Sequence, residues 1–447
     1  MKQNSHTHLK HGVDTHFNLT ELREVLNDLT DSSPGVDGIP YSFIKNCDVA
    51  TLNYFLSVIN LIFDSGKIPS AWKTQIIVPI LKPQKDPNSG LSYRPIALSS
   101  SLVKIAEHMI KRRLDWYVEN EKNLPSSQFG FRKRKSTIES VSILTSDIQL
   151  ALADNESLVG VCLDVCGAFD NVLLDVLFNK LLKIGIPRKL SSFIINLLLT
   201  RKIQIQVLDS PPLERIVNKG LPQGSVLSRI LFNIYTFGLH RSLHPSCKIL
   251  QYADDLFIYI SGRIITILEE IINICMKNLD TWLTNHGLEI SPSKSNVIVF
   301  SRKRVPPRIT VQINNSILPM QVQIRFLGVI LDSKLTWNPY VNFIINKCQA
   351  GLNILRAVSR FWWGSHPFTQ KLFYNAYVRS HLDYASFLIE PTSKKNLARL
   401  DRIQFQSLRL IIGPLKKKEK KREMSKSIFI FLKLTLYSLS STEMTVR

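Results

Sequence analysis

The stretch QYADDLFIYI, residues 251–260, places two adjacent aspartates inside an apolar, aromatic-rich segment. The apolar residues on either side predict two short strands, with Asp254 and Asp255 at the tip of the tight turn that joins them. Adjacent carboxylates repel each other, and in a low-dielectric setting one of them holds a proton unless a cation lies nearby. The stretch therefore predicts a metal ion or a strongly basic group beside the turn.

The composition is that of a globular protein with an unusual excess of positive charge. The chain has 447 residues, 45% hydrophobic and 21% charged, which is enough for two or three domains. Its 57 Lys and Arg against 35 Asp and Glu give a net charge of +22, which favours nucleic acid as a partner ahead of an anionic membrane. Apolar runs are shorter than the ~18 residues that span a bilayer, and the N-terminus lacks the apolar core of a signal peptide. The six cysteines are scattered, which does not suit a disulfide framework. We therefore expect a soluble protein with reduced thiols inside the cell, in the nucleus, the cytoplasm or both.

The first third of the chain alternates between helical and strand patterns. Helical spacing runs through residues 17–30, with Thr20 as the expected N-cap, and again through 51–66. Two strand-like runs, 74–82 and 93–100, then predict a hairpin.

The predicted secondary structure changes from mixed strands and helices to helices alone near residue 335. An apolar strand, 157–165, contains Asp164 near its end, and a helix is expected at about 264–286. From Trp337 onward the apolar spacing is helical, so we expect a domain boundary at 332–340.

Besides Asp254 and Asp255, Asp164 is another acidic residue at the end of an apolar strand. If its strand lies next to the 251–260 hairpin, Asp164 and Asp254 bring oxygen ligands to one point, which suits Mg²⁺ with substrate phosphates. Two such ions about 3.5–4 Å apart would serve an in-line phosphoryl transfer. On spacing alone, a surface hairpin with exposed aspartates also accounts for the pattern.

Three motifs in a fixed order make the metal site the favoured interpretation. LDVCGAFDNV (163–172), KGLPQGSVLS (219–228) and QYADDLFIYI resemble the three palm motifs of reverse transcriptases, specifically those of non-LTR, LINE-like retrotransposons of the jockey type. Further blocks that resemble this family are SPGVDGIP (33–40), VPILKPQKDP (78–87) with YRPIALSS (93–100), QFGFRKRKST (128–137), RFLGVILDSKLTW (325–337) and QSLRLIIG (406–413). The resemblance covers residues 17 to 413.

The resemblance implies an α+β fold of the right-hand polymerase type. Mixed α/β fingers and a palm with an antiparallel sheet would precede an all-α thumb. The expected divisions are an N-terminal helical extension with the start of the fingers (1–61), the fingers and palm (62–331), a thumb-like region (332–413) and a basic, disordered tail (414–447).

The resemblance also implies the site residues. Asp164 and Asp254 would be the main ligands of two Mg²⁺ ions, with Mn²⁺ as the alternative metal and Asp255 as a weaker ligand. Lys294 would protonate the departing pyrophosphate. The residues implied to bind the nucleotide are Lys82 and Arg94 at the triphosphate, Phe169 against a 2′-hydroxyl, and Gln223 with Gly224 along the template and incoming base. Without the resemblance, a core position also accounts for Phe169, and exposed hairpin charges are the commoner explanation of Lys82 and Arg94.

The implied activity is RNA-directed DNA polymerisation, with an RNA template, a DNA primer or target and dNTPs as partners, and without a membrane or a specific protein partner. Basic residues at 132–135 and 104–113 would follow the nucleic-acid backbone. Trp362 and Trp363 would stack on bases or pack between helices.

Some features depart from the family and keep a second function class open. Arg229 stands where the family has proline, the last 21 residues do not resemble the family, and no stretch resembles its endonuclease, zinc knuckle or an RNase H. The alternative is therefore a truncated, inactive retrotransposon relic that only binds nucleic acid. A viral RNA-dependent RNA polymerase is a weaker third class, because Tyr-Ala-Asp-Asp and Phe169 argue against it.

Overall fold

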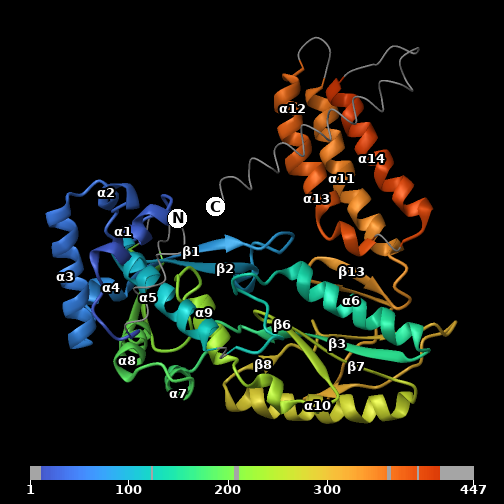
Figure 1. Cartoon of the computed structure of the whole chain (residues 1–447), viewed down its shortest axis with the longest axis horizontal. Coiled ribbons are helices and arrows are strands. Elements are labelled where there is room, and N and C mark those ends of the chain that lie inside the picture. Colours follow the sequence, from blue (N-terminus) through green and yellow to red (C-terminus); the bar gives the residue numbers. More distant parts are fainter. Residues whose placement is uncertain (1–11, 122–123, 206–210, 360–363, 390–391, 413–447) are drawn as a thin grey trace.

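The computed structural model describes residues 12–121, 124–205, 211–359, 364–389 and 392–412 (Figure 1). Helices and strands are mixed through most of the chain and the last described segments are helical, so the α+β expectation is confirmed. Within these residues, no helix combines the length and the apolar character that a bilayer crossing requires.

A four-stranded sheet, here called the first sheet, lies among the N-terminal helices. Its order is β2-β1-β4-β5, with β1 and β4 parallel and the other two pairs antiparallel. The strands are β1 (Thr74–Leu81), β2 (Tyr93–Leu98), β4 (Arg201–Ile205) and β5 (Leu213–Val217). The helices in the same half of the molecule are α1 (Leu19–Asp28), α2 (Tyr41–Lys45), α3 (Val49–Ser65), α4 (Ser70–Lys73), α5 (Ser101–Asn120), α7 (Leu174–Lys183), α8 (Arg188–Leu198) and α9 (Ser228–Tyr235). The predicted hairpin is thus present as β1 and β2.

The start of α1 differs from the expectation. Asn18, not Thr20, is the N-cap: its side chain accepts from the Glu21 backbone N–H, and the Glu21 carboxylate accepts from the Asn18 N–H. Asn is at least as good a cap as Thr, and this reciprocal capping box satisfies two backbone donors at once.

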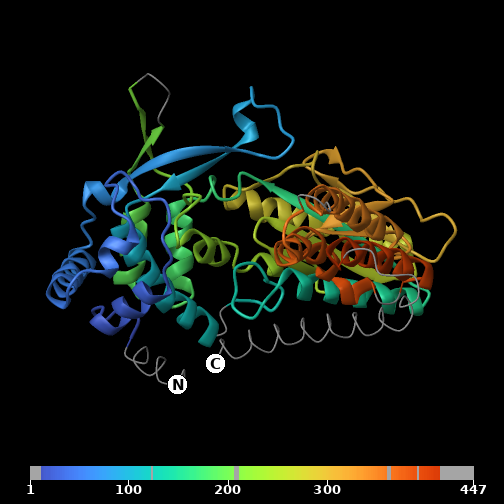
Figure 2. The same cartoon turned by 90° about the horizontal axis from the view of Figure 1, so that it is seen from above.

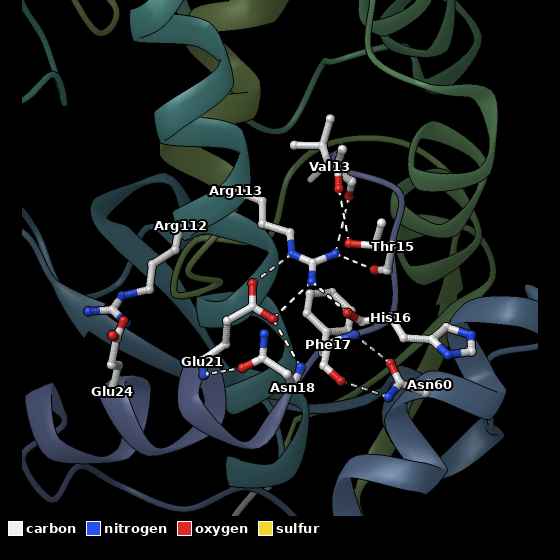
Figure 3. A network of polar contacts seen from close by, with 11 residues as sticks. Val13, Thr15, His16, Phe17, Asn18, Glu21, Glu24, Asn60, Arg112 and Arg113 are labelled. Carbon is white, nitrogen blue, oxygen red and sulfur yellow. Dashed lines mark hydrogen bonds and ion pairs between the residues drawn. The ribbon is translucent and has the colours of Figure 1, made fainter. Parts of the chain in front are cut away.

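The cations of α5 hold the N-terminal segment to the molecule (Figure 3). Arg113 is 3% exposed and donates to the backbone carbonyls of Val13, Thr15 and His16 and to the Glu21 carboxylate at 2.8 Å. Lys104, also buried, donates to a backbone carbonyl. The prediction that these two cations follow nucleic acid is therefore wrong, because charge counted along a helix does not reveal internal partners.

A second sheet carries the acidic motifs. Its order is β6-β7-β3, with β8 and β9 on the other side of β3, and every pair is antiparallel. The strands are β3 (Ser157–Cys166), β6 (Lys248–Tyr252), β7 (Asp255–Gly262), β8 (Glu289–Ile290) and β9 (Asn296–Phe300). Figure 1 shows α6 (Thr137–Ala153) on one face of this sheet and α10 (Ile265–Asn285) on the other.

Alternation along β3 divides the core into two parts. Val159, Val161 and Leu163 join the core that α10 closes, while Leu158 joins the core that α6 closes. Successive side chains of a strand point to opposite faces, so Cys162 and Asp164 share the α6 face with Leu158.

The C-terminal part is built of two small hairpins and helices. The hairpins are β10 (Gln312–Ile313) with β11 (Ser316–Ile317), and β12 (Gln323–Phe326) with β13 (Val329–Asp332). The helices are α11 (Asn338–Val358), α12 (Pro367–Tyr374), a π-helical turn (Asn375–Arg379), α13 (Ser380–Asp383) and α14 (Lys394–Ile412). They lie at the opposite end of the molecule from α1–α4 (Figures 1 and 2). Ile344, Cys348 and Leu352 are buried as the helical spacing predicts. The basic run after residue 414 lies outside the described residues.

Candidate active site

Strand register brings the three aspartates together. In the β3–β7 ladder Asp164 lies directly opposite Asp255, and such cross-strand pairs have Cβ atoms about 4.5–5.5 Å apart. Tyr252 pairs with Asp255, so Ala253 and Asp254 form a two-residue turn, in which Ala253 has a left-handed φ of 57°. Asp254 therefore lies at the tip, beside the other two.

Burial and mutual repulsion perturb these carboxylates. Burial, followed by the charges of Asp254 and Asp164, raises the pKa of Asp255 to about 6. Burial also raises the pKa of Asp254, and the Asp164 charge adds to this effect, while the Lys294 and Arg94 cations oppose it. Removal from water and like charges both disfavour the ionised form, so the cluster favours a cation.

Lys294 is the cation that contacts the cluster directly. Its Nζ lies 2.9 Å from Oδ2 of Asp164, and this bond raises the pKa of Lys294. The turn that carries Lys294 docks onto β3, because the Ser291 N–H donates to the Asp164 carbonyl at 2.8 Å and the Asp164 N–H donates to Ser295 Oγ at 3.3 Å. The basic partner that the 251–260 stretch predicts is therefore present.

The fit of a divalent ion rests on the chemistry of these donors. Among the described residues, no group of three or more His, Cys, Asp and Glu side chains is arranged so that it could hold a metal ion as it stands. The set nevertheless consists of carboxylate oxygens, the donors that Mg²⁺ prefers, and burial and mutual repulsion, which raise the pKa of Asp254 and Asp255, are the effects that a divalent ion would offset.

The loop of residues 219–226 lies between the two sheets. The backbone N–H of Gly220 donates to the Val172 carbonyl at 2.8 Å, and that of Leu221 to the Phe169 carbonyl at 2.7 Å. On the other side, the Ala97 N–H of β2 donates to the Gln223 carbonyl at 2.6 Å.

Gly224 is required in this loop for two reasons. Its φ of 125° is in the left-handed region, and a Cβ there would lie 2.4 Å from the Ala97 carbonyl oxygen. Beside it, Gln223 Nε2 donates to Asp170 Oδ1 at 3.4 Å. The loop thus presents its backbone and one amide side chain close to the acidic motif of β3.

Phe169 belongs to an aromatic group beside this loop. Its half-buried ring stacks on Phe232 with centroids 4.7 Å apart and meets Phe131 edge-on at 6.5 Å. Arg229, which replaces a proline of the resembled family, lies over the Phe131 ring at 5.4 Å. The ring of Phe169 is therefore fixed by its neighbours while part of it remains accessible.

A comparison of the chain with known protein families decides which family these motifs belong to. The model of the family described as reverse transcriptase (RNA-dependent DNA polymerase) matches residues 81–331. The chain belongs to the reverse transcriptase family. The resemblance to jockey-type non-LTR retrotransposon enzymes is confirmed as well.

Two relatives from Drosophila melanogaster illustrate this membership. The chain is 31% identical over 331 residues to the probable RNA-directed DNA polymerase from transposon BS, covering 72% of this chain and 36% of that protein. It is 26% identical over 394 residues to the RNA-directed DNA polymerase from mobile element jockey, covering 85% and 42%. The chain thus spans less than half the length of these relatives. A solved structure of apo telomerase from Candida tropicalis, truncated from the C-terminal domain, aligns with a TM-score of 0.42 at 13% identity over 64% of this chain and 59% of that one.

The structure does not bring every predicted site residue to the reverse transcriptase motifs. The positive charge of Arg94 lowers the pKa of Asp254, so Arg94 lies near the aspartates. The Lys82 ammonium instead donates to the Leu91 carbonyl, in the connection between β1 and β2. In the basic stretch 132–135, Arg132 pairs with Glu119 and Lys135 with Glu139. Trp362 and Trp363 lie outside the described residues.

One face of the first sheet and the 219–226 loop enclose a pocket of about 470 Å³. Alternate residues of β1, β2 and β4 line it, as the period of two in a strand requires, together with the consecutive residues 215–217 of β5. Its lining residues include Ala97, Arg201, Lys219 and Gln223.

Sequence reasoning missed three residues of this region: Glu107, Arg201 and Gly130. Glu107 falls on the apolar stripe of α5 with Val103, Ile110 and Leu114, and a charge in such a stripe was the available signal.

Proposed function

We propose that this chain is the polymerase part of a non-LTR retrotransposon protein and adds dNTPs to a primer 3′-hydroxyl on an RNA template. The observation that carries the proposal is the register of β3 and β7, which sets Asp164 opposite Asp255 with Asp254 at the adjacent turn. Membership of the reverse transcriptase family supports it.

The architecture is assigned in the same proposal. The first sheet with its helices corresponds to the fingers and the second sheet to the palm, together residues 62–331. Residues 332–413 correspond to a thumb and 1–61 to a helical N-terminal extension with the start of the fingers. Support comes from the antiparallel second sheet that bears the aspartates and from the helices α11–α14 that follow it.

Asp164, Asp254 and Asp255 would hold divalent ions, which enzymes of this family use. Bound there, Mg²⁺ or Mn²⁺ would supply positive charge at the attacking hydroxyl and along the triphosphate. The protein's own contribution is position and fixed charge: strand pairing holds the carboxylates before substrate arrives, so little reorganisation remains for the reaction.

The surrounding side chains fit the substrate. Arg94 would pair with the triphosphate, and Lys82 would join it there by turning away from Leu91. Lys294 is held protonated, since its pKa is raised, and would donate a proton to the departing pyrophosphate. Phe169 would exclude a 2′-hydroxyl, and Gln223 with Gly224 would lie along the template and incoming base.

Nucleic acid is the expected partner of the basic surface. The net charge of +22 favours a polyanion, and binding of a primer–template should weaken steeply with salt. Because RNA templates and dNTPs are found inside cells, we place the chain there, in the nucleus or cytoplasm.

Primer extension with an RNA template, a DNA primer, dNTPs and Mg²⁺ tests the proposal. Asp254→Asn should abolish extension and leave the unfolding temperature nearly unchanged. The matched control is Asp154→Asn, an exposed carboxylate three residues before β3, whose first residue Ser157 lies about 23 Å along the strand from Asp164 at ~3.3 Å per residue. Extension absent from wild type that still binds primer–template would establish the inactive relic instead.

A further inference from the structure

Two buried residues of opposite charge hold the two ends of the 219–226 loop. Arg201, the first residue of β4, is 4% exposed, and Glu107 of α5 is 3% exposed. Both come from the part of the chain around the first sheet, whereas the loop leads into α9. Full burial of two charged side chains is costly, so their contacts need a reason.

Arg201 fixes the beginning of the loop. Its Nη2 donates to the carbonyls of Lys219 at 2.6 Å and Gly220 at 2.7 Å, and its Nε donates to the Leu198 carbonyl at 2.9 Å. The planar guanidinium therefore ties α8 and the loop together, a geometry that a lysine cannot reproduce.

Glu107 fixes the end of the loop. Its Oε1 accepts from Ser225 Oγ at 2.7 Å, and its Oε2 accepts from the Val226 N–H at 2.9 Å. Between the two ends, the Ala97 N–H holds the Gln223 carbonyl to the first sheet, and the Gln223 side chain donates to Asp170. The conformation of these two residues thus depends on what holds the loop on either side.

The charged groups around Glu107 do not remove its desolvation. Lys104 on the same helix and Arg201 both favour its ionised form, and Tyr41 of α2 also faces it. Burial still raises the pKa of Glu107 to about 7 and lowers that of Arg201 to about 10. A neutral side chain would be cheaper for folding, so the pair is better explained by a demand on the position of the loop than by stability.

We propose that Glu107 and Arg201 are positioning residues that clamp the 219–226 loop, and that this clamp sets the affinity for the incoming dNTP. The inference rests on the proposed function, since it needs Gln223 and Gly224 to lie along the substrate. Neither positioning residue touches the substrate; each acts through backbone bonds to the loop.

The clamp should appear in KM rather than kcat. Glu107→Gln retains the shape of the side chain and one acceptor oxygen, so it should raise KM for dNTP about tenfold with kcat changed less than about threefold, and Glu107→Ala should raise KM further. Arg201→Lys should shift KM in the same direction. In wild type, kcat/KM should rise with pH through about 7, because the carboxylate is the better acceptor, and Glu107→Gln should lack that step.

The matched control is Glu21→Gln, which replaces another carboxylate that binds a buried arginine, Arg113 (Figure 3). Glu21 is far from the loop in sequence, and its bonds are to other parts of the chain. It should reduce stability and leave KM and the pH profile unchanged. A direct readout uses amide hydrogen exchange of residues 220–226, which should accelerate in Glu107→Gln and not in Glu21→Gln.

The outcomes separate the two proposals. Lack of extension by wild type refutes the proposed function, while the exchange of the loop still tests the clamp. If wild type extends primers and Glu107→Gln matches Glu21→Gln in KM, pH profile and loop exchange, the clamp is overturned. A selective rise in KM with faster loop exchange supports it.

Discussion

Gly130→Ala should disrupt the aspartate turn without altering any charge. The segment that contains Gly130 lies along β6: the Phe129 N–H donates to the Gln251 carbonyl at 2.8 Å, and the Gln251 N–H donates to the Ser127 carbonyl at 2.9 Å. A Cβ at Gly130 would lie 2.5 Å from the backbone nitrogen of Ala253, the first residue of the turn.

The size of the effect follows from that distance. Ordinary contacts begin at 3.4 Å, so the turn or the 127–131 segment must move by about 0.9 Å, and both are backbone held by hydrogen bonds. Overpacking of this kind costs about 1–3 kcal/mol of unfolding free energy. A misplacement near 1 Å at a reacting centre lowers a rate about 10²-fold. We therefore expect kcat/KM to fall about 100-fold while most of the protein remains folded at 25 °C.

Single-nucleotide incorporation and urea unfolding measure the two quantities. The control is Gly90→Ala, because a Cβ there meets nothing within 4 Å and the backbone is not left-handed. That variant should match wild type or be slightly more stable. Equal kcat/KM for the two alanine variants would refute the reasoning, since it would mean that the turn tolerates displacement.

Three further substitutions test other parts of the site. Burial raises the pKa of Glu107 from 4.5 to about 7, so between these pH values the folded protein binds a proton that the unfolded chain has released. The unfolding free energy therefore falls as pH rises through this window, and relative to Glu107→Gln the wild type should lose about 3 kcal/mol between pH 4.5 and 8. Urea unfolding measures this, and parallel pH curves for the two proteins would contradict it. Phe169→Val should admit ribonucleotides and lower stability, because it removes a ring stacked on Phe232 at 4.7 Å; an unchanged ratio of rNTP to dNTP incorporation would remove its assigned role. Lys294→Gln should tighten Mn²⁺ binding severalfold in an electron paramagnetic resonance titration, because it frees Asp164 Oδ2 and removes a nearby positive charge; weaker binding would argue against competition.

Local patterns predicted the elements that bear the candidate site. The β1–β2 hairpin, β3 and the turn between β6 and β7 lie where alternation and turn residues indicate. Asp164, Asp254 and Asp255 stand out in the sequence because a charge at the end of an apolar strand needs a compensating partner.

Partners distant in the chain were not predictable in this way. The cations of α5 appear as a basic surface in the sequence, yet Arg113 binds Glu21 and three carbonyls, and Lys104 is buried. Glu107 and Arg201 become noteworthy when Ser225 and the 219–220 carbonyls are seen beside them. A side chain carries its charge in the sequence, but its partner is a property of the fold.

Periodicity, turn chemistry and motif order were sufficient to place the aspartates at strand ends and to identify the family, because these properties depend on residues a few positions apart. Tertiary packing alone set Asp164 opposite Asp255, turned Lys294 onto Asp164 and buried Glu107 under the 219–226 loop. Those arrangements depend on the register between strands about ninety residues apart and on the desolvation of charges by neighbours from other elements. Neither quantity is encoded in any local stretch of the chain.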